Sequence, residues 1–420
     1  MKVTHVNVSD NKGGAARAAL RLHQGLRQAG IDSSMVVTEK YSADKQIIVP
    51  VHDRMGYFER RLHYRQLSAR FWRYFSTRPD GFDPFTHLST PRNHSLVEQL
   101  PNTDIINLHW IANFVDLPTF FAKTPVPIVW TLHDMNAFTG GCHYTLGCEK
   151  YQNSCGVCPQ LGSNASWDIS RQIWLEKQAQ YRLLLDGKLH IVTPSCWLSE
   201  EARQSPLLGQ MPITVIPNGL NTTVFQPQDQ IEAREKLGIP VAGKVLLFSA
   251  DSIVSRRKGL QYLINALQDI DGQTGIMLVS LGAGKIAKAP KLPMINLGHL
   301  TDAAQIALAY SAADLFVIPS LQDNLPNTVL EALACGTPVV GFDVGGISDM
   351  VRPGITGELV PVKDIRQLRE SILALINNPH KRAEMASNCR QIAVTEYSLH
   401  VQAMHYIQLY QHLLHQESTS

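Results

Sequence analysis

Four cysteines lie close together between positions 142 and 158, with the spacing Cys-x5-Cys-x6-Cys-x2-Cys. They are Cys142, Cys148, Cys155 and Cys158. A Cys-x2-Cys arm flanked by glycine and proline is typical of a tetrahedral thiolate site, so the pattern predicts one structural zinc ion per chain. Unligated thiols or a redox pair are the alternatives. The other cysteines, at 196, 335 and 389, are expected to be plain core or surface residues.

A glycine pair follows the first apolar run. Gly13 and Gly14 stand directly before a segment of helical character, where backbone amides can approach a phosphate and the helix N-terminus favours an anion. The segment is not Gly-x-Gly-x-x-Gly, and no acidic residue is placed convincingly after the second apolar run, so a dinucleotide-binding fingerprint is absent. A tight turn between a strand and a helix is the plainer interpretation.

A polar loop at 319–327 leads into a helical segment that ends at Gly336. The loop carries Asp323 and two asparagines, and Glu331 lies within the helix. Acid and amide groups at the carboxyl end of a strand are suited to sugar and ribose hydroxyls, because ligands of doubly wound sheets bind there. The alternative is a capped helix with a solvated glutamate.

The segment 54–78 combines seven arginines and one acid with interleaved aromatic residues. This composition suits an anionic membrane surface or a lipid-diphosphate acceptor. For the aromatic side chains, a helix or helical pair that packs them on the domain is slightly favoured. The segment would also suit nucleic acid, but nothing else in the sequence supports that partner. His109 and Trp110 follow another apolar run and are expected to face a cleft, where they could contact an acceptor; a packed tryptophan and a hydrogen-bonded core histidine are the alternative.

The elements that must position these residues alternate between short apolar runs and amphipathic segments of helical length. Strands are expected at 2–8, 34–38, 105–108, 127–132, 190–193 and 213–216, and then again at 244–249, 276–281, 315–318 and 338–342. Helices are expected at 15–30, 259–267 and 328–334. Such alternation is typical of parallel sheets covered on both faces, so the predicted fold class is α/β with two doubly wound domains and a ligand between them.

Turn-like residues at 217–230 mark the expected boundary between the domains. The domains are predicted at 1–225, including the cysteine-rich loop at 140–160, and at 226–396. A last helix at 397–420 is expected to pack back on the N-terminal domain.

The composition narrows the class of protein. The 420 residues are 44% hydrophobic and 18% charged, with a net charge of +2, which indicates a globular chain of two or three domains without a field for nucleic acid. No apolar run is long enough to span a bilayer, and the N-terminal residues are too polar for a secretory signal. A cytoplasmic location is therefore expected, where thiols stay reduced.

Taken together, these segments resemble the retaining glycosyltransferases of family 4, whose GT-B fold has two Rossmann-like domains facing across a cleft. The family pattern is a Glu, seven residues, a second Glu and then Ala-x-Ala-x-Gly-x-Pro-Val-Val; here Asp323 takes the first Glu position and Glu331 the second. Further matches follow in the expected order over nearly the whole chain, at Gly13-Gly14, Thr131-Leu132-His133-Asp134, 216–221 with Phe225, Arg257-Lys258-Gly259 and Gly345-Gly346.

The resemblance implies a role for each matched residue. Lys258, beside Arg257, would neutralise the leaving diphosphate, and amides of Gly13, Gly14 and Gly345 or Gly346 would contact phosphate. Glu331 would hold the ribose hydroxyls, and Asp323 the donor sugar. His133 would contact the sugar rather than act as a general base. The remaining donor-site residues implied by the match are Asn324, Leu325 and Asn327.

A fixed ammonium and amides stabilise negative charge where it develops as a diphosphate departs. Retention without an evident nucleophile fits a front-side displacement. No divalent metal and no other cofactor is expected for the chemistry, because Lys258 and helix amides can neutralise the diphosphate and no Asp-x-Asp motif stands near it.

Two positions depart from the family pattern. Many relatives carry an arginine several residues before the lysine, whereas 249–253 contains none, so Arg256 or Arg257 would have to replace it. Asp323 is one methylene shorter than the usual glutamate, which would change the sugar that fits or weaken activity.

The predicted function is transfer of a hexose-type sugar from a nucleotide diphosphate sugar to a saccharide acceptor, free or lipid-linked, with retention. The N-terminal domain would be the acceptor side and the C-terminal domain would bind the donor. The expected setting is bacterial envelope or exopolysaccharide synthesis, with peripheral contact at the inner membrane face through 54–78. A GT-B sugar-nucleotide epimerase or hydrolase is one alternative, and a catalytically weak scaffold that binds partners through the cysteine loop is another.

Overall fold

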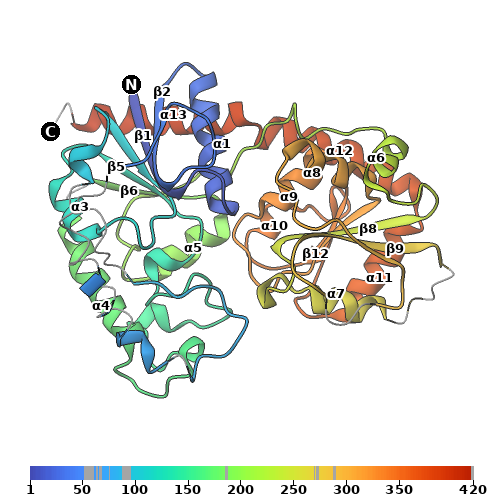
Figure 1. Ribbon diagram of the computed structural model, residues 1–420, viewed down its shortest axis with the longest axis horizontal. Helices are drawn as coiled ribbons and strands as arrows, with labels where there is room; N and C mark the ends of the chain where they lie inside the picture. The colour runs from blue at the N-terminus through green and yellow to red at the C-terminus, as the bar shows by residue number, and fades with distance from the viewer. Residues whose placement is uncertain are drawn as a thin grey trace. The chain divides into compact units, whose positions relative to one another are not determined.

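The computed structural model describes residues 1–51, 61–62, 65, 69–74, 76–87, 96–184, 188–268, 270, 274–286 and 290–417. The chain divides into two compact units, Met1–Pro217 with Gln402–Ser420, and Asn218–Val401. Each unit has a parallel sheet with helices on its faces (Figure 1). The division falls after Pro217 rather than at 225, because Leu220 and Phe225 are buried in the core of the second unit.

The sheet of the first unit has the strand order β3-β2-β1-β4-β5-β6-β7 over the described residues, and every pairing is parallel. The strands are β1 (Lys2–Ser9), β2 (Asp32–Glu39), β3 (Ile47–Ile48), β4 (Ile105–Leu108), β5 (Ile128–Thr131), β6 (Leu189–Thr193) and β7 (Ile213–Val215). The helices are α1 (Gly14–Gln28), α3 (Leu117–Lys123), α4 (Ile169–Tyr181), α5 (Cys196–Gln204) and most of α13 (Leu399–Glu417).

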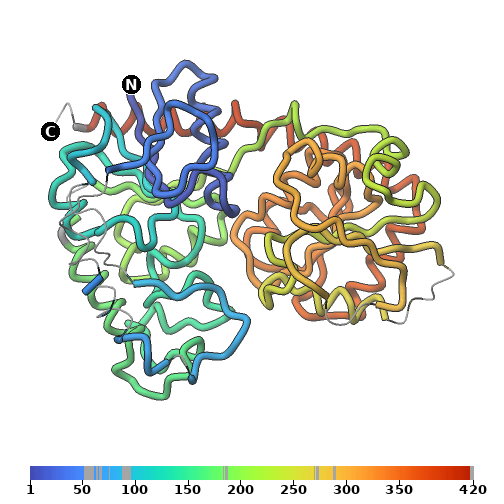
Figure 2. Tube along the Cα trace, viewed as in Figure 1, coloured from blue at the N-terminus to red at the C-terminus, as the bar shows by residue number. Residues whose placement is uncertain are grey.

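The first sheet is buried on both faces because successive apolar side chains point to opposite sides of each strand. Ile105 packs in one cluster with helices α1 and α13, whereas Ile106 packs in another with α3 and the segments around it. Figure 2 traces α13 beside the N-terminal strand, so the two ends of the chain meet in this unit. The unit therefore depends on residues from both ends of the sequence.

The sheet of the second unit has the order β10-β9-β8-β11-β12-β13 over the described residues, again with parallel pairings. The strands are β8 (Lys244–Ser252), β9 (Ile276–Ala283), β10 (Met294–Asn296), β11 (Leu315–Ile318), β12 (Val339–Phe342) and β13 (Gly357–Val360). The helices are α6 (Gln230–Leu237), α7 (Leu260–Leu267), α8 (Ala303–Ala312), α9 (Asn327–Ala334), α10 (Ile347–Met350), α11 (Ile365–Ile376) and α12 (Pro379–Tyr397).

Two doubly wound α/β units with parallel sheets are what the alternating pattern predicts, and that prediction is confirmed. The short strands β3, β10 and β13 are additions that the apolar pattern did not mark. Within the described part of the chain, we find no helix with both the length and the apolar character needed to cross a bilayer.

About half of the arginine- and aromatic-rich segment 54–78 lies outside the described residues. Of its described aromatics, Tyr74 is buried and its hydroxyl accepts a hydrogen bond from the amide of Ile169, and Phe71 packs against the same cluster. Trp72 is exposed. Packing of the aromatics on the unit thus holds for two of these three side chains.

Candidate functional site

The second unit reverses its strand order between β8 and β11, which makes this the place where a doubly wound sheet binds its ligand. The loop after β8 carries Arg257 and Lys258, and the loop after β11 carries Asp323. The sequence prediction placed donor-binding residues on the same two loops. The topology therefore brings together segments that are far apart in the sequence.

Asp323 is the centre of a compact ion cluster. Its Oδ2 lies 2.5 Å from Nζ of Lys258, and its Oδ1 lies 3.2 Å from a guanidinium nitrogen of Arg257. The hydroxyl of Ser320 donates to the same carboxylate at 3.2 Å. Burial alone would raise the pKa of Asp323, but the charges of Lys258 and Arg257 outweigh it, so the pKa of this carboxyl is lowered. Arg256 is exposed, so Arg257 is the arginine that reaches this cluster.

The two loops are held together by their backbones. The amide of Leu321 donates to the carbonyl of Arg257 at 2.7 Å, and the Arg257 guanidinium donates to the carbonyl of Gln322 at 3.0 Å. Gly259 has φ of 71°, and a Cβ there would overlap the carbonyl oxygen of Pro319. Glycine at 259 therefore permits the close approach that sets Lys258 against Asp323.

Gly345 and Gly346 form the third side of the cluster. The amide of Gly346 donates to the carbonyl oxygen of Asp323 at 3.0 Å, and a Cβ on Gly345 would overlap that same oxygen. The Gly346 amide is thus used by a protein carbonyl in this conformation. The glycine loop after β12 fixes the backbone of Asp323.

Glu331 lies on α9 and is buried, so the interpretation of a solvated glutamate does not hold. The hydroxyl of Tyr310 donates to Oε2 of Glu331 at 3.3 Å. Burial, and next the charge of Glu331, raise the pKa of Tyr310 well above its ordinary value. Asn324 and Leu325 are also buried beside Asp323, and Asn327 is the first residue of α9.

The first unit has its own reversal of strand order, between β1 and β4. The loop after β1 ends at Gly13, whose φ is 91° and around whose Cβ position the space is open to 4 Å. Gly14 begins α1. The Asp10 carboxylate accepts the amides of Tyr41 and Ser42, and this contact orders the start of the loop. A partly exposed helix start with open space beside it is compatible with an anion.

His109 and His133 follow β4 and β5, the neighbouring strands on the other side of this reversal. His109 is buried and lies within hydrogen-bond distance of two other histidines, His5 and His133. Trp110 donates its indole N–H to Oδ2 of Asp134 at 3.0 Å. These residues line a pocket of about 30 Å³ that also includes His143. His109 therefore contributes to the pocket from within the core rather than from an open surface.

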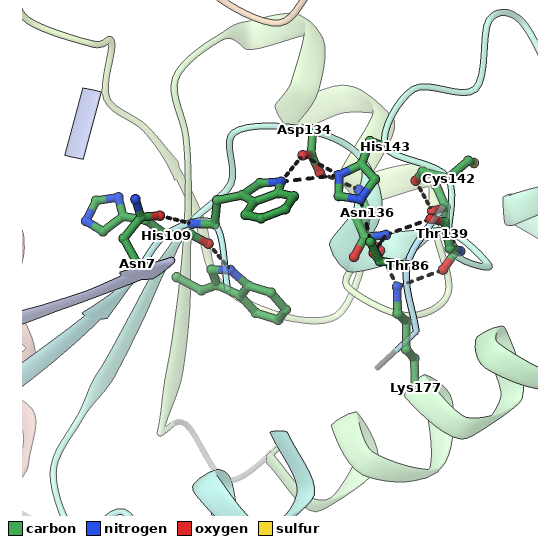
Figure 3. A network of polar contacts seen from close by, with 12 residues as sticks. Asn7, Thr86, His109, Asp134, Asn136, Thr139, Cys142, His143 and Lys177 are labelled. Carbon is green, nitrogen blue, oxygen red and sulfur yellow. Dashed lines mark hydrogen bonds and ion pairs between the residues drawn. The ribbon is translucent and has the colours of Figure 1, made fainter. Parts of the chain in front are cut away.

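Figure 3 shows that residues of this pocket belong to a larger network of polar contacts. The sequence did not reveal this network. His143 Nδ1 lies 2.7 Å from Oδ2 of Asp134, and its Nε2 lies 3.0 Å from the Thr86 hydroxyl. Burial alone raises the pKa of Asp134, but the neighbouring His143 outweighs it and the net pKa is lowered. Asn7 anchors the backbone of Trp110 by accepting its amide at 2.8 Å. In the sequence, Asp134 ends the matched segment 131–134 and His143 lies in the cysteine-rich loop, but neither position indicates that the two residues pair.

The four-cysteine loop folds so that all four thiols line one cavity of about 20 Å³. None of these cysteines, all within the described residues, forms a disulfide. Burial raises the pKa of Cys155 to about 12 and that of Cys158 to about 11, although hydrogen bonds from the backbone act in the opposite direction. Among the residues that the structure describes, no group of three or more histidine, cysteine or acidic side chains has the arrangement to hold a metal ion.

A buried lysine from α4 lies next to this loop. The Lys177 ammonium donates to the carbonyls of Asn136 and Thr139, the latter at 3.0 Å, and the Thr139 hydroxyl donates to the carbonyl of Cys142 at 2.6 Å (Figure 3). Burial lowers the pKa of Lys177 to about 8, while the nearby thiols of Cys142 and Cys155 act in the opposite direction. The lysine thus connects the cysteine loop to the residues after β5.

Comparison with solved structures defines the class of protein. The chain is similar to sucrose-phosphate synthase from Thermosynechococcus elongatus, with a TM-score of 0.66 and 19% identity over 98% of this chain and 99% of that one. It is similar to HepE from Anabaena, solved with UDP-glucose, with a TM-score of 0.62 and 16% identity over the full length of both. The lipopolysaccharide glycosyltransferase WaaG gives a TM-score of 0.60 at 17% identity, over 97% of this chain and 99% of that one. The fold is the GT-B fold.

Sequence comparison defines the family. Residues 12–224, half of the chain, match the family described as Glycosyltransferase Family 4, and residues 243–378 match Glycosyl transferases group 1. The chain therefore belongs to glycosyltransferase family 4, as the motifs predicted.

Two relatives illustrate the range of similarity within this family. A protein of Escherichia coli K12 that is named as the colanic acid biosynthesis glycosyl transferase WcaC is 25% identical over 380 residues, 88% of this chain and 89% of its own. D-inositol 3-phosphate glycosyltransferase from Thermobispora bispora is 32% identical over 191 residues, 42% of this chain. That second match spans less than half of the relative's length, 45%.

Proposed function

We propose that this protein transfers a sugar from a nucleotide diphosphate sugar to a saccharide acceptor. The observation that carries the proposal is the ion cluster at the strand reversal of the second unit, where Lys258 and Arg257 converge on the buried Asp323. The HepE structures contain UDP-glucose, or UDP with glucose, in a protein of the same fold. A donor of that chemical class supplies the diphosphate that two converging cations would bind.

The cluster suggests how a donor would be received. Lys258 is paired with Asp323 in this structure and is partly exposed, so an arriving diphosphate would compete for the ammonium. Asp323 would then be able to accept a hydrogen bond from a hydroxyl of the donor sugar. As the bond to the sugar breaks, Lys258 and Arg257 would neutralise the charge that develops on the leaving diphosphate. Glu331, already fixed by Tyr310, would accept the ribose hydroxyls.

The finer aspects of the function follow from the family resemblance. We propose that transfer retains the anomeric configuration, that no divalent metal takes part, and that the acceptor is a saccharide of the bacterial envelope or an exopolysaccharide. The name of WcaC, colanic acid biosynthesis, supports that class of acceptor. Contact with an anionic membrane surface through 54–78 is proposed from its seven arginines.

The test is turnover of a panel of UDP-, GDP-, ADP- and dTDP-linked sugars, with binding measured by titration calorimetry. We expect one donor class to bind and to be cleaved, and both properties to be lost in Lys258→Ala and Glu331→Ala. Lys381→Ala is the matched control, since Lys381 pairs with Glu358 in the same unit and lies outside the ion cluster. Failure of every donor to bind would overturn the proposal and favour a scaffold. Release of an isomerised or free sugar, with no acceptor able to receive it, would favour the epimerase or hydrolase.

We also propose that the four cysteines bind one structural zinc ion. The donor set supports this, because four thiols share one small cavity and a buried ammonium lies beside two of them, where it would offset the negative charge of a zinc–thiolate cluster. Binding would require the thiols to close around the metal, since the described conformation has no formed ligand set. Such a cluster would brace the segment that carries His143.

Elemental analysis of the purified chain tests the zinc proposal. We expect about one zinc per chain in the wild type and in Cys196→Ser, whose cysteine is exposed and lies outside the loop. The double variant Cys155→Ser with Cys158→Ser is expected to contain no zinc and to unfold more readily. A fully folded wild-type preparation without metal would contradict the proposal.

A further inference from the structure

Three histidines of the first unit form a chain of ring contacts that leads from the core to the pocket. Nδ1 of His5 lies 2.9 Å from Nε2 of His109, and Nδ1 of His109 lies 3.0 Å from Nε2 of His133. The rings of His109 and His133 are stacked with centroids 5.3 Å apart. His5 comes from β1, and the other two follow β4 and β5 directly. The adjacent strands of the sheet therefore fix the order of the three rings.

Burial sets the number of protons that these three histidine rings carry. His5 and His109 are fully enclosed, and burial lowers their pKa values well below the ordinary value, while that of His133 is lowered to about 4. Near neutral pH each ring is therefore uncharged and carries one N–H. Because His109 has a single proton and contacts both neighbours, it donates to one of them and accepts from the other. Only two arrangements of the protons remain: the N–H groups point either from His5 toward His133 or from His133 toward His5.

His5, at the buried end of the row of three rings, selects between these two arrangements. Nε2 of His5 is fully buried and has no hydrogen-bond partner among the described residues. If the N–H groups pointed from His133 toward His5, Nε2 of His5 would carry an unpaired buried N–H, and buried N–H groups without a partner are rarer in proteins than buried acceptors without one. The opposite direction leaves only a lone pair there. His5 then donates from Nδ1 to His109, and His109 donates from Nδ1 to Nε2 of His133.

We propose that His5 and His109 are positioning residues that hold His133 in the tautomer protonated at Nδ1. The lone pair of His133 is then occupied by the N–H of His109, and the group that His133 offers to the pocket is an N–H donor. Such a ring can donate to a sugar oxygen but has no lone pair left to accept a proton. The identity of that oxygen as part of a sugar rests on the proposed function. The tautomer itself rests only on the geometry of the free protein.

Nitrogen NMR of the full-length chain with ¹⁵N-labelled histidine tests the tautomer directly. We expect His133 to show a protonated Nδ1 and an unprotonated Nε2, opposite to the tautomer that a free imidazole side chain favours in water. In His109→Phe, His133 loses its donor and is expected to shift toward the Nε2-protonated form. A wild-type His133 protonated at Nε2, or a tautomer unchanged in His109→Phe, would overturn the proposal. The wild-type spectrum decides the question even if the variant does not fold.

A matched control is His190→Gln, which removes another buried histidine of the same sheet. His190 Nε2 lies 2.8 Å from the Thr214 hydroxyl and takes no part in the three-ring chain, so the His133 signals should stay as in the wild type. Turnover of the donor is then compared in His109→Phe and His190→Gln, and we expect about a tenfold loss only in the former, the value of one hydrogen bond. If His133 shows the expected tautomer but the protein binds no nucleotide sugar, the proposed function is refuted and the proposed tautomer is confirmed.

Discussion

At the scale of single residues, the proposed donor site is built from charges that already satisfy one another in the free protein. Lys258 and Arg257 share the Asp323 carboxylate, so the free protein does not present bare cations to solvent. Removing one partner of a buried pair leaves the other charges uncompensated. The same carboxylate thus stabilises the free site and competes with the ligand that the site is proposed to bind.

Replacing Asp323 by asparagine should separate these two effects. We expect Asp323→Asn to bind a nucleoside diphosphate more tightly, because Lys258 and Arg257 lose their internal competitor, and to turn over the sugar donor more slowly, because the hydroxyl acceptor is lost. Calorimetric titration and donor turnover measure the two. Asp302→Asn, which alters an exposed cap of α8, is the control and should change neither. Weaker binding of the diphosphate by Asp323→Asn would show that the carboxylate does not compete with it.

Buried histidines give the fold a pH dependence whose sign is fixed. In the described part of the chain, burial is the chief cause of a lowered pKa in five histidines, which are His5, His23, His109, His133 and His190. Below about pH 6.5 the unfolded chain binds protons that the folded chain refuses, so the free energy of unfolding falls as the pH falls toward about 4. Each such group contributes about 1.4 kcal/mol per pH unit within that window.

Urea unfolding between pH 7 and pH 5 measures this slope. We expect the midpoint to decrease steadily in the wild type and less steeply in His190→Gln, which has one buried histidine fewer. His380→Gln, at an exposed position on α12, should leave the slope as it is. Equal slopes in all three proteins would mean that burial does not keep His190 neutral.

At the scale of elements, the strand order explains why loops distant in sequence form one site. The loops after β8, β11 and β12 converge because these strands are neighbours, and glycines at 259 and 345 let their backbones touch. The apolar periodicity predicted the long strands, and the resemblance to the family singled out Lys258, Asp323 and Glu331. The resemblance could not predict the contact between Lys258 and Asp323, because it assigns Lys258 to the leaving diphosphate and Asp323 to the donor sugar.

The first unit shows a different limit of sequence reasoning. The sequence indicated no role for His5, Asp134 or His143, and their contacts became visible only when β1, β4 and β5 were placed side by side. For His109 the sequence left a cleft-facing position and a core position open, because the residue after a strand can face either the core or the solvent. Contacts made across strands depend on register, which periodicity along one strand does not contain.

Glycine at position 259 provides a test at this scale. Gly259→Ala should lower the free energy of unfolding of the second unit by more than the roughly 1 kcal/mol of a left-handed alanine, because its Cβ would also push the Pro319 carbonyl away. Gly238→Ala is the matched control, with a φ of 67° and open space around the Cβ position. Donor affinity should fall in Gly259→Ala alone. Equal destabilisation of the two variants would show that the close approach of Gly259 to the Pro319 carbonyl does not affect the free energy of unfolding.

At the scale of the whole molecule, the first unit is completed by the end of the chain. Helix α13 covers one face of the first sheet, where the buried Tyr410 hydroxyl accepts a hydrogen bond from Asn107 at 2.7 Å and Tyr406 lies 2.9 Å from the Thr131 hydroxyl. The second unit has separate cores. The stability of the first unit therefore depends on residues that follow the whole of the second in the sequence.

Tyr410→Ala is expected to destabilise the first unit by about 3–5 kcal/mol through loss of a large buried side chain. Tyr410→Phe should cost about 1–3 kcal/mol, because it leaves the buried Asn107 amide without its acceptor. Urea unfolding followed by fluorescence should then show two transitions, with the second unit unchanged. Met404→Ala, at a half-exposed position of the same helix, is the control. A single transition that shifts as a whole would mean that the units unfold together.

The position of α13 also dictates an order of events during synthesis. The ribosome synthesises the strands of the first sheet early, yet α13, which covers part of one face of that sheet, follows residue 398. The second unit can fold while this part of the apolar face is still exposed. We therefore expect the nascent chain to recruit chaperones while the second unit is translated, until α13 docks.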